Sequence, residues 1–129
     1  MRAATLTQRG VTVCLLDDDR SVLKATGRLL RSAGWEVEAF SDPIKFLDNA
    51  TICQPRVVVL DILMPVMNGL EVQDQLRRIS PLSRVIILTS KDDEVVRKKA
   101  KNQGAIAFFL KPVGDEEFLS AIEAAFSGN

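Results

Sequence analysis

The sequence predicts a single α/β domain, built as a doubly wound parallel sheet with helices on both of its faces. Five short apolar runs alternate with segments whose apolar residues recur at helical spacing, which is the pattern of repeated strand–helix units. Four of these runs end on polar side chains, at the sheet edge where open α/β sheets bind their ligands. The length of 129 residues suits one hydrophobic core.

The first half of the chain is expected to form two strand–helix units. Val11–Leu16 is an apolar run typical of a buried strand, and apolar residues then recur at helical spacing until Gly34, a residue typical of a helix C-terminus. Trp35–Phe40 alternates apolar and acidic residues, which suits an edge strand with one solvated face. Asp19 is expected to cap the first helix, and Pro43 suits the first turn of the second.

The second half continues the same alternation. Arg56–Asp61 is apolar on both faces, as a central parallel strand is, and Asn68 followed by Glu71 indicates a capped helix start. The helix expected after the fourth strand is rich in lysine and has few apolar residues, so its hold on the core should be weak. The remaining elements are strands at Arg84–Thr89 and Ala105–Leu110, that basic helix at about Asp92–Gln103, and a closing amphipathic helix with apolar positions from Phe118 to Phe126.

Composition excludes several classes of function. Seventeen basic and seventeen acidic residues balance, so no net field favours nucleic acid or a membrane surface as a partner. The chain has no histidine, and its two cysteines, Cys14 and Cys53, are far apart, which excludes the common zinc frameworks. We expect two free thiols in a reducing cytoplasm. No apolar run reaches membrane-spanning length, and residues 1–10 lack the apolar centre of a signal peptide.

The polar strand ends predict one site. If Asp17, Asp18 and Asp61 lie within about 5 Å of one another, each like-charge pair costs about 3 kcal/mol at an effective dielectric near 20. A cation should therefore enter, or some of the carboxylates should protonate. Carboxylate oxygens with room for water suit Mg²⁺. Lys111 adds an ammonium and Thr89 a hydroxyl, which together with a metal are the groups that hold a phosphoryl group. Asp61, alone at the end of the central strand, is the expected nucleophile.

Four motifs carry a resemblance to a known family. From about Val11 to Phe126 the chain resembles the receiver (CheY-like) domain of two-component response regulators. The resemblance implies a receiver domain at residues 11–127 after an N-terminal extension at 1–10, and the flavodoxin-like strand order 2-1-3-4-5. The motifs are LLDDD (Leu15–Asp19), LDILMPVMNG (Leu60–Gly69), ILTS (Ile87–Ser90) and FFLKP (Phe108–Pro112).

The resemblance also implies roles for the site residues. Asp61 would accept a phosphoryl group from a sensor histidine kinase or a phosphotransfer protein. Asp18 would bind Mg²⁺ directly and Asp17 through water, with the backbone carbonyl of Leu63 as a further ligand beside Asp61 itself. Lys111 would hold the phosphoryl oxygens. The domain would catalyse only its own phosphorylation and dephosphorylation, so it is not expected to be an enzyme in the usual sense.

A signalling switch is implied as well. Thr89 matches the switch hydroxyl of the family and Phe108 the switch aromatic, which together reshape the face formed by the fourth helix, fifth strand and fifth helix. That face would contact a downstream effector or a second copy of the chain. The peptide bond from Lys111 to Pro112 is expected to be cis.

Two other functions are compatible with parts of the pattern. Asp17-Asp18-Asp19 also fits the Asp-x-Asp motif of a haloacid-dehalogenase-type phosphatase, with Asp17 as nucleophile, although the further acidic pair of that family is missing. A receiver-like binding module without phosphorylation is the second alternative. Its mark would be the loss of an acidic residue, the acceptor or the lysine, and none is lost.

Overall fold

The computed structural model describes residues 12–127, so the N-terminal extension predicted at 1–10 and Val11 lie outside the described residues. Five parallel strands form one sheet in the order β2-β1-β3-β4-β5, as predicted. The strands are β1 (Thr12–Leu16), β2 (Glu36–Phe40), β3 (Val57–Leu60), β4 (Arg84–Thr89) and β5 (Ala107–Leu110).

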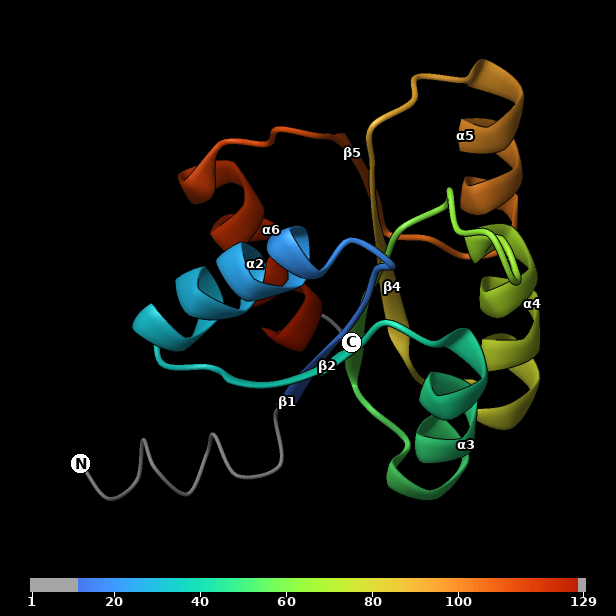
Figure 1. Ribbon diagram of the computed structural model, residues 1–129, viewed down its shortest axis with the longest axis horizontal. Coiled ribbons are helices and arrows are strands. Elements are labelled where there is room, and N and C mark those ends of the chain that lie inside the picture. Colours follow the sequence, from blue (N-terminus) through green and yellow to red (C-terminus); the bar gives the residue numbers. More distant parts are fainter. Residues whose placement is uncertain (1–11, 128–129) are drawn as a thin grey trace.

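Helices cover both faces of this sheet (Figure 1). On one face α2 and α6 pack together over the sheet, and on the other face α3, α4 and α5 lie side by side. The helices are α2 (Arg20–Ser32), α3 (Pro43–Cys53), α4 (Gly69–Ile79), α5 (Glu94–Asn102) and α6 (Asp115–Ser127). The predicted architecture, a doubly wound α/β domain, is therefore confirmed.

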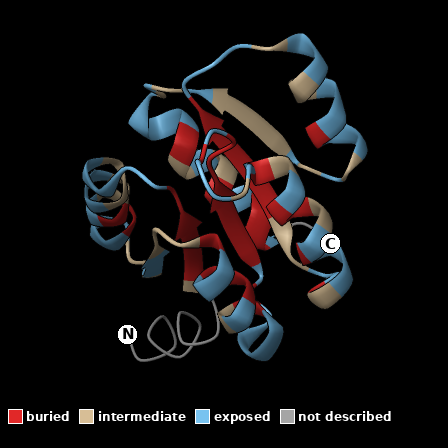
Figure 2. Ribbon diagram, turned by 45° about the vertical axis from the view of Figure 1, so that its right-hand side comes forward, coloured by how far each residue is buried: buried red, intermediate tan, exposed pale blue. Residues whose placement is uncertain are grey.

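The core lies on either side of the three interior strands, β1, β3 and β4, which are buried along almost their whole length (Figure 2). In β1, Val13 and Leu15 point toward α2 and α6, whereas Cys14 and Leu16 point toward α3 and α4. The edge strand β2 exposes Glu36 and Glu38, which explains why its sequence alternates. β1 and β3 are thus packed on both faces up to the residues that follow them.

Aspartate and asparagine side chains begin four of the helices. Asp19 caps α2 by accepting hydrogen bonds from the backbone N–H groups of residues 21 and 22, and Asp42 caps α3 directly before Pro43. Asn68 forms the expected capping box at the start of α4. The basic helix was expected from about Asp92, but it begins at Glu94 because the side chain of Asp93 accepts from the backbone N–H groups of Val95 and Val96 and acts as the cap.

Three strands are shorter than the apolar runs that predict them. Trp35 lies outside β2 and stacks on Phe126 with ring centroids 4.5 Å apart. Arg56 precedes β3 and sends its guanidinium to the carbonyl oxygen of Phe126, 2.8 Å away. Both residues are drawn toward the end of α6 by contacts that a sequence pattern does not contain. Similarly, β5 begins at Ala107 instead of Ala105.

The helix α5 is held to the rest of the domain by few apolar contacts, as expected. Ala100 is buried, whereas Val95 is 76% exposed. A polar bridge compensates in part: the fully buried amide of Gln73 in α4 donates to the carbonyl oxygen of Ala100 at 2.9 Å and accepts from Gln103 at 3.0 Å. Among residues 12–127, Cys14 and Cys53 are free thiols, and no described helix is long and apolar enough to cross a membrane.

Candidate phosphoacceptor and metal site

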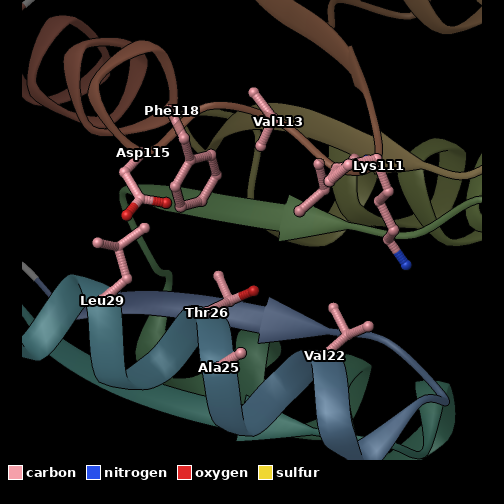
Figure 3. Close-up of a pocket in the computed structure, with 10 residues that line it drawn as sticks. Val22, Ala25, Thr26, Leu29, Lys111, Val113, Asp115 and Phe118 are labelled. Carbon is pink, nitrogen blue, oxygen red and sulfur yellow. The ribbon is translucent and has the colours of Figure 1, made fainter.

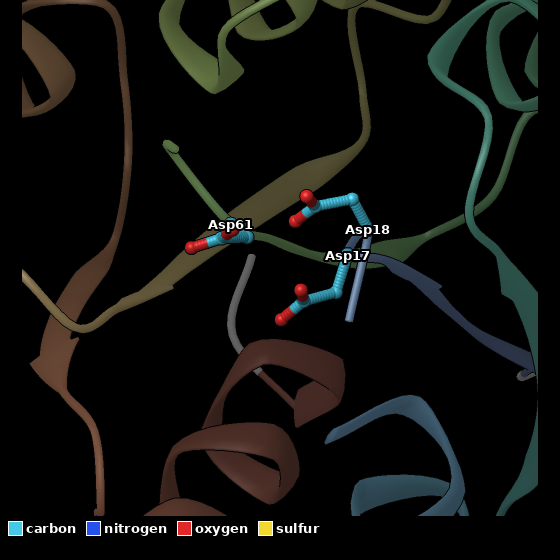
Figure 4. A group of neighbouring side chains, drawn as sticks. All are labelled: Asp17, Asp18 and Asp61. Carbon is cyan, nitrogen blue, oxygen red and sulfur yellow. The ribbon is translucent and has the colours of Figure 1, made fainter. Parts of the chain in front are cut away.

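The acidic residues of the predicted site meet where β1 and β3 end. Asp17 and Asp18 follow β1, and Asp61 follows β3, its neighbour in the sheet. The backbone N–H of Asp61 donates to the carbonyl oxygen of Leu16 at 3.0 Å, which continues the strand pairing to this point. One carboxylate oxygen from each of Asp17, Asp18 and Asp61 lies within 4.8 Å of the others (Figure 4). The sequence prediction that these groups converge is confirmed.

Lys111 enters the same site from the end of β5. Its ammonium nitrogen lies 2.7 Å from Asp17 Oδ2 and 3.6 Å from Asp61 Oδ1. The other oxygen of Asp17 accepts from the backbone N–H of Asp19 at 2.9 Å. Asp17 is therefore satisfied on both oxygens, and it is only 5% exposed. This direct ion pair was not expected from the sequence, which placed Lys111 opposite a phosphoryl group.

Asp61 is the member of the cluster whose charged form is most disfavoured. Burial and the neighbouring charge of Asp17 raise the pKa of the Asp61 carboxyl to about 6, although Lys111 acts in the opposite direction. The charge of Asp18 raises this pKa further, and a hydrogen bond from the backbone N–H of Leu63 lowers it. Asp61 Oδ1 is buried and has no hydrogen-bond partner among the described residues. A buried oxygen of this kind is a candidate ligand or nucleophile.

The donor set fits a hard divalent cation. Three carboxylates lie close enough to share one ion, Asp18 is exposed, and the unpaired oxygen of Asp61 lacks a positive partner at hydrogen-bond distance. Oxygen ligands with access to water are those that Mg²⁺ uses in proteins. The residues present therefore fit the metal that the sequence predicts. The carbonyl of Leu63 as a further ligand stays a prediction.

Thr89 lies at the end of β4, between the strands that carry Asp61 and Lys111. The backbone N–H of Lys111 donates to the Thr89 carbonyl oxygen at 2.7 Å. The Thr89 hydroxyl is buried and has no hydrogen-bond partner within the described part of the chain. The hydroxyl is thus available to a ligand that enters the site. The peptide bond from Lys111 to Pro112 is cis, as expected.

Gly69 shapes the loop that follows Asp61. Its N–H donates to the carbonyl oxygen of Ile62 at 2.9 Å, which folds the chain back onto the end of β3. A Cβ atom at this position would lie 2.3 Å from the Asp61 carbonyl oxygen. Only glycine fits here, because the obstructing atoms belong to the backbone. The sequence showed this residue only as part of a turn motif.

Phe108 lies in β5, opposite Ile87 and hence below the rim that carries the acidic cluster. Its ring is half-buried and packs against the core beneath α3, α4 and α5. The guanidinium of Arg97 covers the ring, with a distance of 4.7 Å from the guanidinium carbon to the ring centroid. The predicted switch residues therefore lie on neighbouring strands, β4 and β5.

A cavity of about 600 Å³ lies beside the acidic cluster, between α2 and α6 (Figure 3). Side chains from α2, including Val22 and Leu29, face Val113 and Phe118 across it. Lys111 stands at one end, so the cavity and the acidic site share a wall. Nothing in the sequence pattern indicated this cavity, because its lining residues are typical of a core.

Comparison with known proteins agrees with this geometry. Residues 13–123 match the family described as response regulator receiver domain. The chain is 38% identical over 120 residues to the response regulator protein TodT of Pseudomonas putida, a match that covers 93% of this chain and 53% of TodT. The chain thus spans about half the length of the curated relatives it matches. It belongs to the response regulator receiver family.

Two solved structures show how closely the fold agrees. The receiver domain protein (CheY-like) from Methanospirillum hungatei superposes with a TM-score of 0.84 at 26% identity, over 88% of this chain and 90% of that one. The beryllofluoride-activated NtrC4 receiver domain dimer gives a TM-score of 0.85 at 29% identity, over 89% of this chain and 95% of that one.

Proposed function

We propose that this receiver domain takes a phosphoryl group onto Asp61 from a sensor histidine kinase or a phosphotransfer protein, in a Mg²⁺-dependent reaction. The observation that supports this most directly is the buried, unpaired oxygen of Asp61 beside two further carboxylates and an ammonium group. The domain would catalyse only its own phosphorylation and dephosphorylation. We place it in the cytoplasm, where the free thiols Cys14 and Cys53 stay reduced.

In the proposed reaction the Asp61 carboxylate oxygen attacks phosphorus. The new O–P bond forms as the P–N bond of the phosphohistidine donor breaks, and the imidazole leaves with the electron pair. Asp18 would hold the metal directly, Asp17 through water, and Leu63 through its backbone carbonyl. When bound, Mg²⁺ neutralises the phosphoryl oxygens and orients them.

A bound metal would also change which carboxylate Lys111 pairs with. Because Lys111 pairs with Asp17 at 2.7 Å and lies 3.6 Å from Asp61 Oδ1, its ammonium group is within reach of Asp61 without making a hydrogen bond to it. With a cation beside Asp17, the Lys111 ammonium would be able to leave Asp17 and pair with a phosphoryl oxygen on Asp61. The Thr89 hydroxyl, buried and unpaired, would donate to another phosphoryl oxygen.

The output of this switch would be a change in the face formed by α5, β5 and α6. Thr89 would move toward the phosphoryl group and Phe108 would turn inward behind it. The weakly packed α5 suits a two-state element. We propose that this face contacts a downstream effector or a second copy of the chain. The beryllofluoride-activated NtrC4 receiver domain, which has a similar structure, is a dimer in its solution structure.

The test is phosphorylation of the purified chain by acetyl phosphate with Mg²⁺, followed by intact mass. We expect one phosphate on the wild-type chain and none on Asp61→Asn. Asp17→Asn is the matched comparison: it should weaken metal dependence but leave Asp61 as the modified residue in peptide mapping. Phosphate on Asp17 would favour the phosphatase alternative, and a wild-type chain without phosphate would favour a receiver-like binding module.

A further inference from the structure

The contact between Arg97 and Phe108 joins α5 to β5 close to the switch residue Thr89 of β4. Phe108 pairs with Ile87, which stands two residues before Thr89 in β4. The guanidinium carbon of Arg97 lies 4.7 Å from the centroid of the ring, within the range of a cation–π contact. The guanidinium is also directed by Asp92, whose carboxylate lies 3.4 Å away. The Arg97 side chain is thus held against the ring by its pair with Asp92 as well as by the ring itself.

This contact is a large part of what fixes α5 near the switch residues. Among the apolar residues of α5, Ala100 is buried and Val96 is partly buried, whereas Val95 projects into solvent. The polar bridge through Gln73 reaches only Ala100 and the residues after it. The N-terminal half of α5 therefore depends on Val96 and on the stacked guanidinium.

The buried Thr89 hydroxyl completes the arrangement. It has no hydrogen-bond partner among residues 12–127, so no hydrogen bond to the protein opposes its movement toward a ligand. A turn of Phe108 into the core, as the proposed switch requires, would by contrast give up the stacking with Arg97 seen here. The contact therefore stabilises one state of the switch and not the other, which is the requirement for biasing an equilibrium.

From this we infer that Arg97 is a positioning residue, which holds Phe108 in the half-buried position seen here and thereby lowers the population of the state that accepts phosphate. The inference rests on the proposed function and adds a regulatory residue to it. A protein whose competent state is only partly populated reacts more slowly by that fraction, so removal of Arg97 should speed phosphorylation.

The experiment compares initial rates of phosphorylation by limiting acetyl phosphate with Mg²⁺ in the full chain. Arg97→Ala should react about two- to fivefold faster than wild type, the range expected for loss of one partly exposed cation–π contact. Arg97→Lys keeps a cation near the ring but loses the planar stack, so its rate should fall between the two. Lys98→Ala, a change at an exposed neighbour on the same helix, should match wild type.

A double-mutant cycle with Phe108→Leu separates this role from general support of α5. With the ring removed, Arg97→Ala should have no further effect on the rate. Equal acceleration in both backgrounds, or an Arg97→Ala variant that loses thermal stability without reacting faster, would overturn the inference. Wild-type chain that takes up no phosphate at all would instead refute the proposed function, and the inference with it.

Discussion

Replacing Asp61 with asparagine should stabilise the metal-free protein, although it removes the proposed phosphoacceptor. Asp61 is 5% exposed and close to Asp17 and Asp18, so its charged form is disfavoured in the folded state. Its pKa rises from the ordinary 3.8 to about 6. Asparagine has nearly the same shape and carries no charge, so it removes this conflict.

The expected size follows from that shift. A difference of about two pKa units corresponds to about 3 kcal/mol between the two protonation states. Solvent that reaches the rim of the site screens part of the repulsion, so we expect Asp61→Asn to raise the free energy of unfolding by about 1–2 kcal/mol at neutral pH. Lys111 keeps its pair with Asp17 in the variant, so no lysine is left unpaired.

The pH dependence has a definite sign. Between the unfolded value of 3.8 and the folded value of about 6, the folded protein binds more protons than the unfolded chain, so the wild type loses stability as the pH rises through this window. The advantage of Asp61→Asn should therefore be full above about pH 7 and disappear below the unfolded pKa.

Urea unfolding in the presence of a chelator is the assay, with the fluorescence of Trp35, the single tryptophan, as the probe. Trp35 stacks on Phe126 and precedes β2, whereas the site residues follow the strands, so Trp35 lies at the opposite end of the sheet. Its signal therefore reports global unfolding. Added Mg²⁺ should stabilise the wild type more than the variant, because the variant has lost a ligand. A variant less stable than wild type without metal, or an advantage that does not change with pH, would refute this reasoning.

Three further substitutions test other contacts of the site and its support. Gly69→Ala should cost about 1–3 kcal/mol and slow phosphorylation, because its Cβ would collide with the Asp61 carbonyl oxygen; urea unfolding and acetyl phosphate kinetics measure the two effects. Gln73→Ala should cost about 2–3 kcal/mol in urea unfolding, because it leaves a cavity and removes one of the two donors to the carbonyl oxygen of Ala100, the other being the N–H of Ala105. Lys111→Met should cost about 2 kcal/mol without metal and regain part of it with Mg²⁺, because Asp17 loses its counter-charge.

Each of these has a matched control in the chain. A Cβ at Gly114 would meet only the flexible end of Glu117 at 4.0 Å, so Gly114→Ala should be tolerated. Gln75 lies on the exposed side of α4, and Gln75→Ala should change stability little. Lys91→Met removes an exposed lysine near the site. Controls as damaging as their partners would show that the assigned contacts are not the cause.

The alternation of apolar runs was enough to predict an α/β domain whose polar strand ends share one edge, and the resemblance to receiver domains supplied the strand order that puts β1 beside β3. Asp17 and Asp61 follow adjacent parallel strands, and the carboxyl ends of such strands share one edge whatever the details of packing. The helix caps were also predictable, because Asp19 and Asn68 act on backbone groups within a few residues of themselves. These features depend on local periodicity or on topology.

The features that the sequence did not indicate depend on distances between elements far apart in the chain. Lys111 pairs with Asp17 across 94 positions, and Gln73 reaches α5 across 27. The cover of Phe108 by Arg97 is set by where α5 lies on the sheet, which no periodicity specifies.

By itself, then, the sequence determined which residues stand at the sheet edge, because strand ends and caps are local properties. Only the tertiary structure decided which of those residues pair, which stay unpaired, and where a cavity opens between α2 and α6. The physical reason is that charge, burial and hydrogen bonding act over a few ångströms in space. Those distances are set by the packing of whole helices against the sheet.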